Sequence, residues 1–561
     1  MQAIPPPAKA RRYPRQNNDE RYSPSRILQF TLKGILFMIV KPVWKNILSL
    51  CLLWQIAIFP AHAEQANTHQ VNLSNLTYPD LIISLYKHYP DKQIWLQAAL
   101  RDEFEKQISL LIFADISKDL NHSYQALTTA AEQQDWKKYE LLASDLLLFY
   151  LSYSEQIADN ETSWLLGDSI THKLRPPSKK SIDAFFNADS NQSRLLYLQT
   201  ISPMSEQQTR LYLNLLALNE TAKKNIKRQR FDELVKIGDA LKEKKILLSR
   251  LHVAGELSAQ IKEQIELENN QLYSQQLGKI IKSFQIRHGL KPDGVVGNKT
   301  RYWLNISRQE RVRLMALNIL RQPLWKADKT SRILVNIPDY QMAYWEADQM
   351  LFESKIIVGQ VKRKTPIFTA KLDSIVFNPT WNVPTSIMRK DILPKTLLNN
   401  NYLNLHRYEI LEDWHSNKII DITTIDWKTT TVNNFPYKLR QKSGRDNALG
   451  LYKFNTPNKD AIYLHDTPAK YLFEKENRAF SSGCIRVQKA EQFALLLMDK
   501  SDYTFQDYKN YHNSDTNSVL PLKKNIRVYT VYQTAWVDQF GATQFRNDIY
   551  DYDKPRKRKI L

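Results

Sequence analysis

Residues 461–487, AIYLHDTPAKYLFEKENRAFSSGCIRV, constrain this chain more than any other stretch. They contain Cys484, one of only two cysteines among 561 residues, and His465, nineteen positions earlier. That separation cannot bring two side chains together on one helix, so they meet only where the chain folds back. A thiol with an ordinary pKa near ~8.5 is mostly protonated at neutral pH, and an adjacent imidazole converts it to the nucleophilic thiolate. The alternative is that Cys484 is a small buried hydrophobe and His465 a core histidine.

Local signals indicate such a fold-back. The apolar run 461–464 is typical of a strand, and Asp-Thr-Pro at 466–468 ends it, so His465 lies at the end of a strand. A turn of small residues, 481–483, stands directly before Cys484. The glycine of this turn lets the backbone approach a bound carbonyl closely.

The segments HDTP and SSGCIRV resemble the signature of the L,D-transpeptidase catalytic domain (YkuD family). That signature ends in Ser/Thr-x-Gly-Cys-x-Arg. Many members carry histidine where this chain has Ser482, and the upstream element here is HDTP rather than His-Gly. That variant is similar to the large periplasmic, YcbB-like branch of the family. The resemblance favours the catalytic interpretation of Cys484 and His465 over the structural one.

The resemblance implies an enzyme that cross-links peptidoglycan stem peptides without a cofactor. Cys484 would attack the carbonyl at the L-centre of the third residue, diaminopimelate in Gram-negative members, and expel the terminal D-Ala as a thioester forms. The side-chain amine of a neighbouring stem would then give a 3→3 cross-link, with His465 moving the proton. Carbapenems would acylate the same thiol. Two alternatives stay open: an L,D-carboxypeptidase or cysteine peptidase acting on cell-wall peptides, and a non-catalytic protein that binds glycan strands.

Neighbouring residues have expected roles in this chemistry. Asp466 or the Ser482 carbonyl would orient the imidazole, and the sequence does not decide between them. The backbone N–H groups of Gly483 and Cys484, together with the Tyr463 hydroxyl, would stabilise the oxyanion.

Two further side chains are ambiguous. Arg486 would bind a substrate carboxylate or form a structural salt bridge, and Trp381 would line the substrate channel or anchor the core. The predicted catalytic set is Cys484, His465, Asp466, Gly483 and Ser482, and the predicted substrate-binding set is Tyr463, Arg486, Trp381 and Ser481.

Charge and cysteine content bound the partners and the compartment. The net charge of +21 suits work among anionic cell-wall polymers or lipid headgroups near the inner membrane, and the export signal described next argues against nucleic acid. Beyond the targeting region Cys484 stands alone, because the other cysteine is Cys51, so no intramolecular disulfide forms there. The paired-cysteine motifs of zinc sites are absent, and we expect no metal. The sequence indicates no particular protein partner.

Residues 1–63 are expected to direct export. Their apolar core, 47–60, of about 14 residues is too short for a comfortable membrane span, and Ala-His-Ala at 61–63 is a small-x-small cleavage site. We expect a periplasmic chain cleaved after Ala63, or one that keeps the segment as an inner-membrane anchor. Translation from Met38 rather than Met1 would give a signal peptide of normal length.

Residues 64–258 show apolar residues at helical spacing, and the resemblance implies a helical scaffold. Residues 259–310 contain FQxxxGLxPDGVVGxxT, which resembles the small three-helix peptidoglycan-binding domain. His288 within it is expected to be a surface residue at a helix end. Residues 311–330 are expected to be a connector.

Residues 331–553 alternate in the manner of antiparallel strands and would form the catalytic domain, with a final hairpin around Gly541. This alternation stops over residues 387–448, a segment that is too long to be a simple loop. In the YcbB-like branch an insertion at this position forms a lid. Residues 554–561 are a basic tail. The expected fold class is therefore multidomain α+β: a helical scaffold, a small three-helix peptidoglycan-binding domain, and a mainly-β catalytic domain with an inserted lid subdomain.

Overall fold

The structure is a computed structural model. It describes residues 76–88, 93–159, 162–170, 173–222, 229–268, 270–325, 330–416 and 418–554, all within one compact unit, Val71–Leu561. The expected export segment, its cleavage point after Ala63, and the basic tail after residue 554 lie outside the described residues. Among the helices that are described, none is long and apolar enough to cross a membrane.

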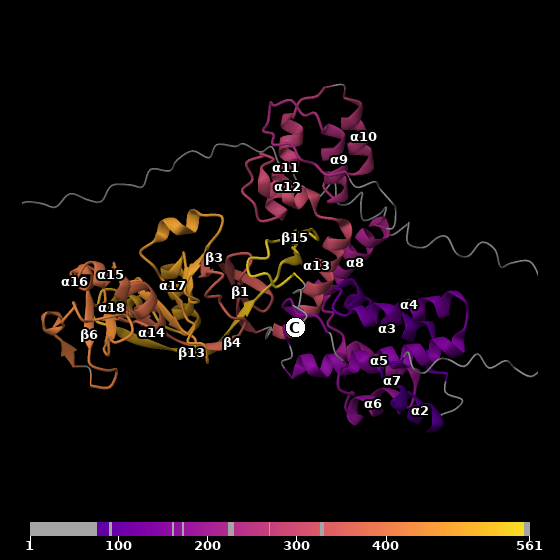
Figure 1. Cartoon of the computed structure of the whole chain (residues 1–561), viewed down its shortest axis with the longest axis horizontal. Helices are drawn as coiled ribbons and strands as arrows, with labels where there is room; N and C mark the ends of the chain where they lie inside the picture. The colour runs from indigo at the N-terminus through magenta and orange to yellow at the C-terminus, as the bar shows by residue number, and fades with distance from the viewer. Residues whose placement is uncertain are drawn as a thin grey trace, which may run out of the picture. The chain divides into compact units, whose positions relative to one another are not determined.

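The N-terminal part is helical and is built around α5 (Figure 1). Every residue of α5 from 142 to 153 is buried, as expected of a helix that is apolar on nearly every face. Two acidic side chains on it accept hydrogen bonds from backbone N–H groups: Glu140 from Ile94 and Trp95, and Asp145 from residues 77 and 78. The elements are α2 (Pro79–His88), η2 (Ile94–Leu96), α3 (Ala98–Phe113), α4 (Lys118–Glu132), α5 (Trp136–Ala158), η3 (Thr162–Leu165), α6 (Lys179–Phe186), α7 (Asn191–Ile201) and α8 (Glu206–Ala222).

The segment that resembles a peptidoglycan-binding domain follows as a second group of helices. Gln285 explains why the motif combines a glutamine with a Pro-Asp-Gly turn. Its amide nitrogen donates to Asp293 and to the Val295 carbonyl, and its amide oxygen accepts from the N–H of Gly294. One side chain therefore stabilises the whole turn. Backbone bridges join Val235 to Val296 and residue 240 to residue 272, so the contacts extend before the expected boundary at 259. The helices are α9 (Lys244–Val253), α10 (Ala259–Leu267), α11 (Gln275–Arg287), α12 (Asn298–Asn305) and α13 (Arg308–Arg321), followed by η4 (Gln322–Trp325).

His288 corrects an expectation, because it is fully buried rather than a surface residue. Its Nδ1 bonds to the Phe284 carbonyl at 2.6 Å, and its Nε2 lies 2.8 Å from Arg311 Nη1. A carbonyl only accepts and a guanidinium only donates, so the ring is the neutral Nδ1–H tautomer. Burial, followed by the charge of Arg311, places the pKa of His288 well below its usual value.

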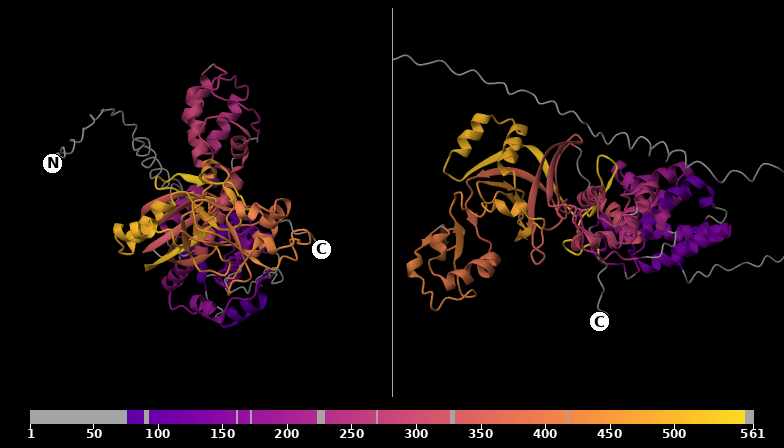
Figure 2. Two further views of the ribbon diagram at one scale, coloured as in Figure 1. Left: turned by 90° about the vertical axis from the view of Figure 1, so that its left-hand side faces the viewer. Right: turned by 90° about the horizontal axis from the view of Figure 1, so that it is seen from above.

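Among the described residues, nine strands form the sheet of the C-terminal domain, in the order β11-β3-β12-β10-β9-β4-β13-β1-β2. Because β3 also pairs with β2, the sheet closes on itself. Buried aliphatic and aromatic side chains, including residues of α17, fill its core. Figure 2 shows the ribbon of this domain, in orange to yellow, from two further sides. The elements are β1 (Ser331–Asn336), β2 (Gln341–Glu346), β3 (Gln349–Gly359), β4 (Thr369–Phe377), β9 (Tyr452–Asn455), β10 (Leu464–His465), η7 (Lys470–Glu474), β11 (Ala479–Ser481), β12 (Ile485–Val487), α17 (Ala490–Lys500), α18 (Phe505–His512) and β13 (Ser518–Val531).

The insertion expected at 387–448 folds as a subdomain of its own, joined by β5 just before it (Figure 1). It has a separate sheet, β5-β8-β6-β7, and a separate core. Its elements are β5 (Trp381–Asn382), α14 (Thr385–Ile387), the π-helical turn η5 (Met388–Ile392), α15 (Leu393–Leu398), α16 (Tyr402–Leu405), β6 (Tyr408–Leu411), β7 (Ile419–Ile420), η6 (Ile422–Thr424) and β8 (Lys438–Gln441).

The expected hairpin around Gly541 has shorter strands than the sequence suggested, β14 (Ala535–Val537) and β15 (Thr543–Phe545). Ala535, Val537 and Phe545 pack into the core of the helical part rather than that of the sheet. A helical N-terminal part beside a mainly-β domain confirms the predicted α+β fold class.

A buried ion pair ties the chain end to α13. Arg321 is fully buried and donates to Asp553 at 2.7 Å, to the Leu165 carbonyl at 2.7 Å and to the Tyr552 carbonyl at 2.8 Å. We expect Asp553→Asn to lower the free energy of unfolding by about 3 kcal/mol, because it leaves a buried guanidinium without a counter-charge. Urea denaturation measures the change.

The control is Asp551→Asn, which removes the exposed partner of Lys554 and changes stability by less than about 1 kcal/mol. Equal stability of the two variants would contradict the role of the Arg321 pair.

Candidate active site

The pairing of β10 with β12 brings the predicted residues onto one face of the sheet. The strands run parallel, with Leu464 opposite Ile485 and His465 opposite Arg486. Leu464 and Ile485 are fully buried in the core of the sheet. Since side chains alternate along a strand, His465, Arg486 and Cys484 lie on the opposite face.

Cys484 is partly exposed, and its thiol donates to the Ala461 carbonyl, with Sγ 4.0 Å from that oxygen. Burial raises the pKa of the thiol above its ordinary value; the polar groups of Tyr463, and then the charges of Lys453 and Arg486, oppose that rise only in part. The thiol is therefore protonated at neutral pH and needs a base to become a nucleophile.

His465 is buried and can serve as that base. Its Nδ1 lies 2.5 Å from the backbone carbonyl of Asp466, which fixes the Nδ1–H tautomer and leaves Nε2 as an acceptor. Burial, and then the charge of Arg486, lowers the pKa of His465 to about 3. Thiol and imidazole are thus both neutral in the resting site.

The carboxylate of Asp466 points away from the imidazole. It accepts the N–H of Leu451 at 3.1 Å and forms an ion pair with Lys470. Gly450, at φ +61°, packs against this carboxylate so closely that an added Cβ would overlap it. Of the two predicted orienting groups, Asp466 is the one bonded to His465, through its main chain rather than its side chain.

The turn before the nucleophile is held from both sides. Ser481 Oγ donates to the Cys484 carbonyl at 2.6 Å and accepts the N–H of Gly483 at 3.1 Å. The Gly483 carbonyl accepts from Thr365 Oγ1 at 2.7 Å, and Thr365 in turn accepts the N–H of Gly359. Gly483 lies at φ +122°, a conformation that favours glycine. Because the N–H of Gly483 already donates to Ser481 Oγ in the substrate-free site, Gly483 shapes the turn there and does not offer a free donor to an oxyanion.

Ser482 connects the turn to the inserted subdomain. Arg363 Nη1 donates to Ser482 Oγ at 2.8 Å, and the same guanidinium forms a two-pronged ion pair with Asp391 in η5. Position 482 is therefore linked through one arginine to the first turns of the insertion.

Trp381 packs against the core of the inserted subdomain, where its ring centre lies 6.4 Å from that of Tyr408, so the structure favours the core-anchor alternative. Trp381 lies in β5, where the inserted subdomain begins. Arg486 forms no salt bridge with any described carboxylate, and its buried Nε has no hydrogen-bond partner. The structure thus disfavours the structural salt bridge that the sequence left open.

Lys453 is a site residue that sequence reasoning missed. It lies on β9 opposite His465, and its Nζ is 4.6 Å from the centre of the Tyr463 ring. The available signal was a lysine between two aromatic residues, Tyr452 and Phe454, that are both buried.

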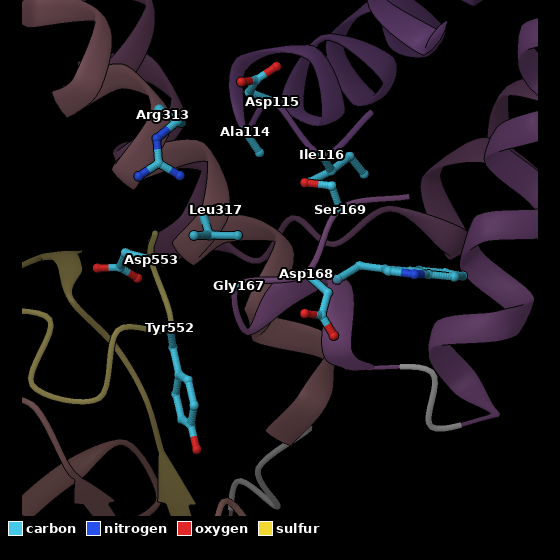
Figure 3. Close-up of a pocket in the computed structure, with 11 residues that line it drawn as sticks. Ala114, Asp115, Ile116, Gly167, Asp168, Ser169, Arg313, Leu317, Tyr552 and Asp553 are labelled. Carbon is cyan, nitrogen blue, oxygen red and sulfur yellow. The ribbon is translucent and has the colours of Figure 1, made fainter. Parts of the chain in front are cut away.

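Figure 3 shows a separate pocket that is lined by residues from other parts of the chain. None of the predicted site residues lines it. Arg313, the one base at its rim, is already paired with Glu310. Its lining is Ala114, Asp115, Ile116, Trp164, Gly167, Asp168, Ser169, Arg313, Leu317, Tyr552 and Asp553.

Comparison with known proteins identifies the class of the β-rich domain. Residues 330–537 match the YkuD family model, described as the L,D-transpeptidase catalytic domain. A Haemophilus influenzae protein provisionally named as an L,D-transpeptidase is 28% identical over 487 residues, which cover 87% of this chain and 81% of that protein. An L,D-transpeptidase structure from Stackebrandtia nassauensis aligns with 54% of this chain and 96% of its own, at 12% identity and a TM-score of 0.21. An L,D-transpeptidase structure from Xylanimonas cellulosilytica aligns with 54% of this chain and 100% of its own, at 12% identity and a TM-score of 0.16. TM-scores this low do not establish a shared fold.

The β-rich domain is therefore an L,D-transpeptidase catalytic domain of the YkuD type.

The neutral state of His465 can be tested directly. A histidine with the ordinary pKa near 6.5 is about 97% protonated at pH 5; with a folded-state pKa of about 3, His465 stays neutral there. Because the unfolded chain takes up this proton near pH 6.5, the associated stability is complete above that pH and declines as pH falls toward 3. NMR of ¹³Cε1-labelled histidine, assigned with His465→Gln, should show no titration of His465 between pH 5 and 8. A midpoint near 6.5 would contradict the site described here.

The ion pair between Arg363 and Asp391 leads to a second prediction. The two side chains are 23% and 41% exposed, respectively, so Arg363→Met should lower the global stability by less than about 1 kcal/mol. Removing the link should still let the start of the insertion open more often, and amide exchange in η5 and α15 should speed up. Lys418→Met, which breaks the exposed pair with Glu412 within the insertion, is the control and should leave that exchange unchanged. Unchanged exchange in Arg363→Met would show that the link does not hold the insertion.

Proposed function

We propose that this protein is a periplasmic L,D-transpeptidase that forms 3→3 cross-links between peptidoglycan stem peptides through a thioester on Cys484. The observation that carries the proposal is a partly exposed thiol on one sheet face with an imidazole whose Nδ1–H is bonded to the Asp466 carbonyl. The match of residues 330–537 to the family and the named relative support it.

In the acylation step, His465 Nε2 takes the thiol proton as the sulfur attacks the L-centre carbonyl of the donor stem. The Tyr463 hydroxyl, one of the polar groups that oppose the rise in the pKa of the thiol, would donate to the developing oxyanion. When the tetrahedral intermediate collapses, the C–N bond breaks, the imidazolium gives its proton to the leaving amine, and D-Ala departs.

In the transfer step, the amine of a second stem attacks the thioester carbonyl while His465 accepts its proton. The C–S bond breaks, an amide forms, and the proton returns to the sulfur as the thiol. Water in place of the amine would give hydrolysis by the same route, so the acceptor decides between cross-linking and an L,D-carboxypeptidase.

Two other parts of the chain have proposed roles. Residues 259–310 would bind glycan strands, and the motif side chain Gln285 supports an intact fold for this module. The insertion at 387–448 would act as a lid, supported by its separate core and by its link to Ser482 through Arg363. A lid would favour transfer over hydrolysis by excluding water from the thioester.

The proposal is tested with purified protein, a stem tetrapeptide and mass spectrometry of the products. Wild type should release D-Ala and form the cross-linked dimer, and incubation with a carbapenem should add the mass of one drug molecule at Cys484. Cys484→Ala should remove both signals, and His465→Gln should slow acylation by about 100-fold or more.

His415→Gln, in an exposed turn of the insertion, is the control for loss of a histidine. Unchanged turnover in a folded Cys484→Ala variant would end the nucleophile assignment. Release of tripeptide alone, with no dimer, would favour the carboxypeptidase.

A further inference from the structure

Lys453, His465 and Arg486 form one row across the catalytic face. Lys453 on β9 and Arg486 on β12 are each the register partner of His465 on the strand between them. Neighbouring strands lie about 4.8 Å apart, so the two cations flank the imidazole from opposite sides. Phe454 and Leu464, the next residues along, point into the core, which places the row on the face of Cys484.

Neither cation of the row is neutralised by the described part of the chain. Lys453 forms no ion pair there, although Asp373 attracts it weakly, and its Nζ rests over the Tyr463 ring. Arg486 likewise has no carboxylate partner. Burial lowers the pKa of both groups, so two half-buried positive charges are held on either side of the imidazole at a cost in free energy.

Three other cations around the site have a carboxylate partner: Lys470 is bonded to Asp466, Arg363 to Asp391, and Lys355 to Glu474. The two cations of the row face the thiol without such a partner among the described residues, as expected of a site that receives an anion from the substrate.

The proposed donor brings a suitable anion. Its terminal residue carries a free α-carboxylate, attached to the carbon that bears the scissile nitrogen, within a few bonds of the attacked carbonyl. The Nζ of Lys453 lies 4.6 Å from the centre of the Tyr463 ring, which itself lies 5.7 Å from the ring of His465, so the ammonium is close to the proposed general base.

We propose that Lys453 binds the free α-carboxylate of the terminal residue that leaves the donor stem, and so selects donors with an unblocked end. The inference rests on the proposed function and adds a specificity-determining residue to it. A carboxylate bound in this row also offsets the positive charge that opposes protonation of His465, so an occupied subsite makes the base more effective.

The test measures binding apart from chemistry. In the Cys484→Ala background, calorimetry compares a stem tetrapeptide with the same peptide ending in a carboxamide. We expect the acid to bind about 10–100-fold more tightly, the free energy of one charged hydrogen bond. Adding Lys453→Met should abolish this preference, because it weakens binding of the acid peptide only. Lys453→Arg should retain part of the preference. The control Lys371→Met, which replaces an exposed lysine on β4, should retain all of it.

The same preference should appear in turnover by the protein with Cys484 intact, where Lys453→Met raises KM for the acid donor relative to KM for the amide donor, while any change in kcat from the lost charge is common to both donors. An acid-to-amide ratio that survives Lys453→Met in the binding experiment would overturn the proposal. Equal weakening of both peptides would also overturn it, since Lys453 would then support the site without reading the carboxylate. A wild-type protein that shows the binding preference but releases no D-Ala would refute the transpeptidase proposal and leave the subsite standing.

Discussion

The catalytic face depends on the parallel pairing of β10 with β12. Both strands are very short, yet Leu464 and Ile485 are fully buried opposite each other, and a slip of one residue would drive polar side chains into the core. Two aliphatic residues thus decide which face receives Cys484 and His465. Since β3 and β9 flank the pair and the sheet closes on itself, the register is held from both sides.

The sequence was most informative where the relevant contacts are local. Cys484 and His465 stand in segments whose strand, break and turn are formed by adjacent residues, and the structure places His465 on β10 and Cys484 directly before the neighbouring strand β12. The burial of His288 could not be foreseen, because Arg311, which bonds its ring, belongs to a later helix. Lys453 was missed for a related reason: the aromatic residues on either side of it in the chain do not indicate a site, and only the order of strands puts it beside the imidazole.

The resting site combines neutral reactive groups with a positive surrounding. Burial disfavours charge on both the thiol and the imidazole, and the cations on the same face disfavour the imidazolium further while favouring the thiolate. The same cations therefore make the thiol easier to deprotonate and the imidazole harder to protonate, so their two effects on proton transfer from sulfur to nitrogen oppose each other. An anionic substrate changes this balance more than a neutral one does, so recognition and activation are coupled through the electrostatics of one sheet face.

The inserted subdomain begins and ends on paired strands, with Trp381 opposite Gln441. Its entry and exit are therefore about one strand spacing apart, and to the rest of the sheet the whole insertion is equivalent to a short loop. Its own core packs without help from the sheet that carries the thiol. An architecture of this kind lets the surface beside the nucleophile lengthen, shrink or be exchanged over evolution while the reacting groups keep their register.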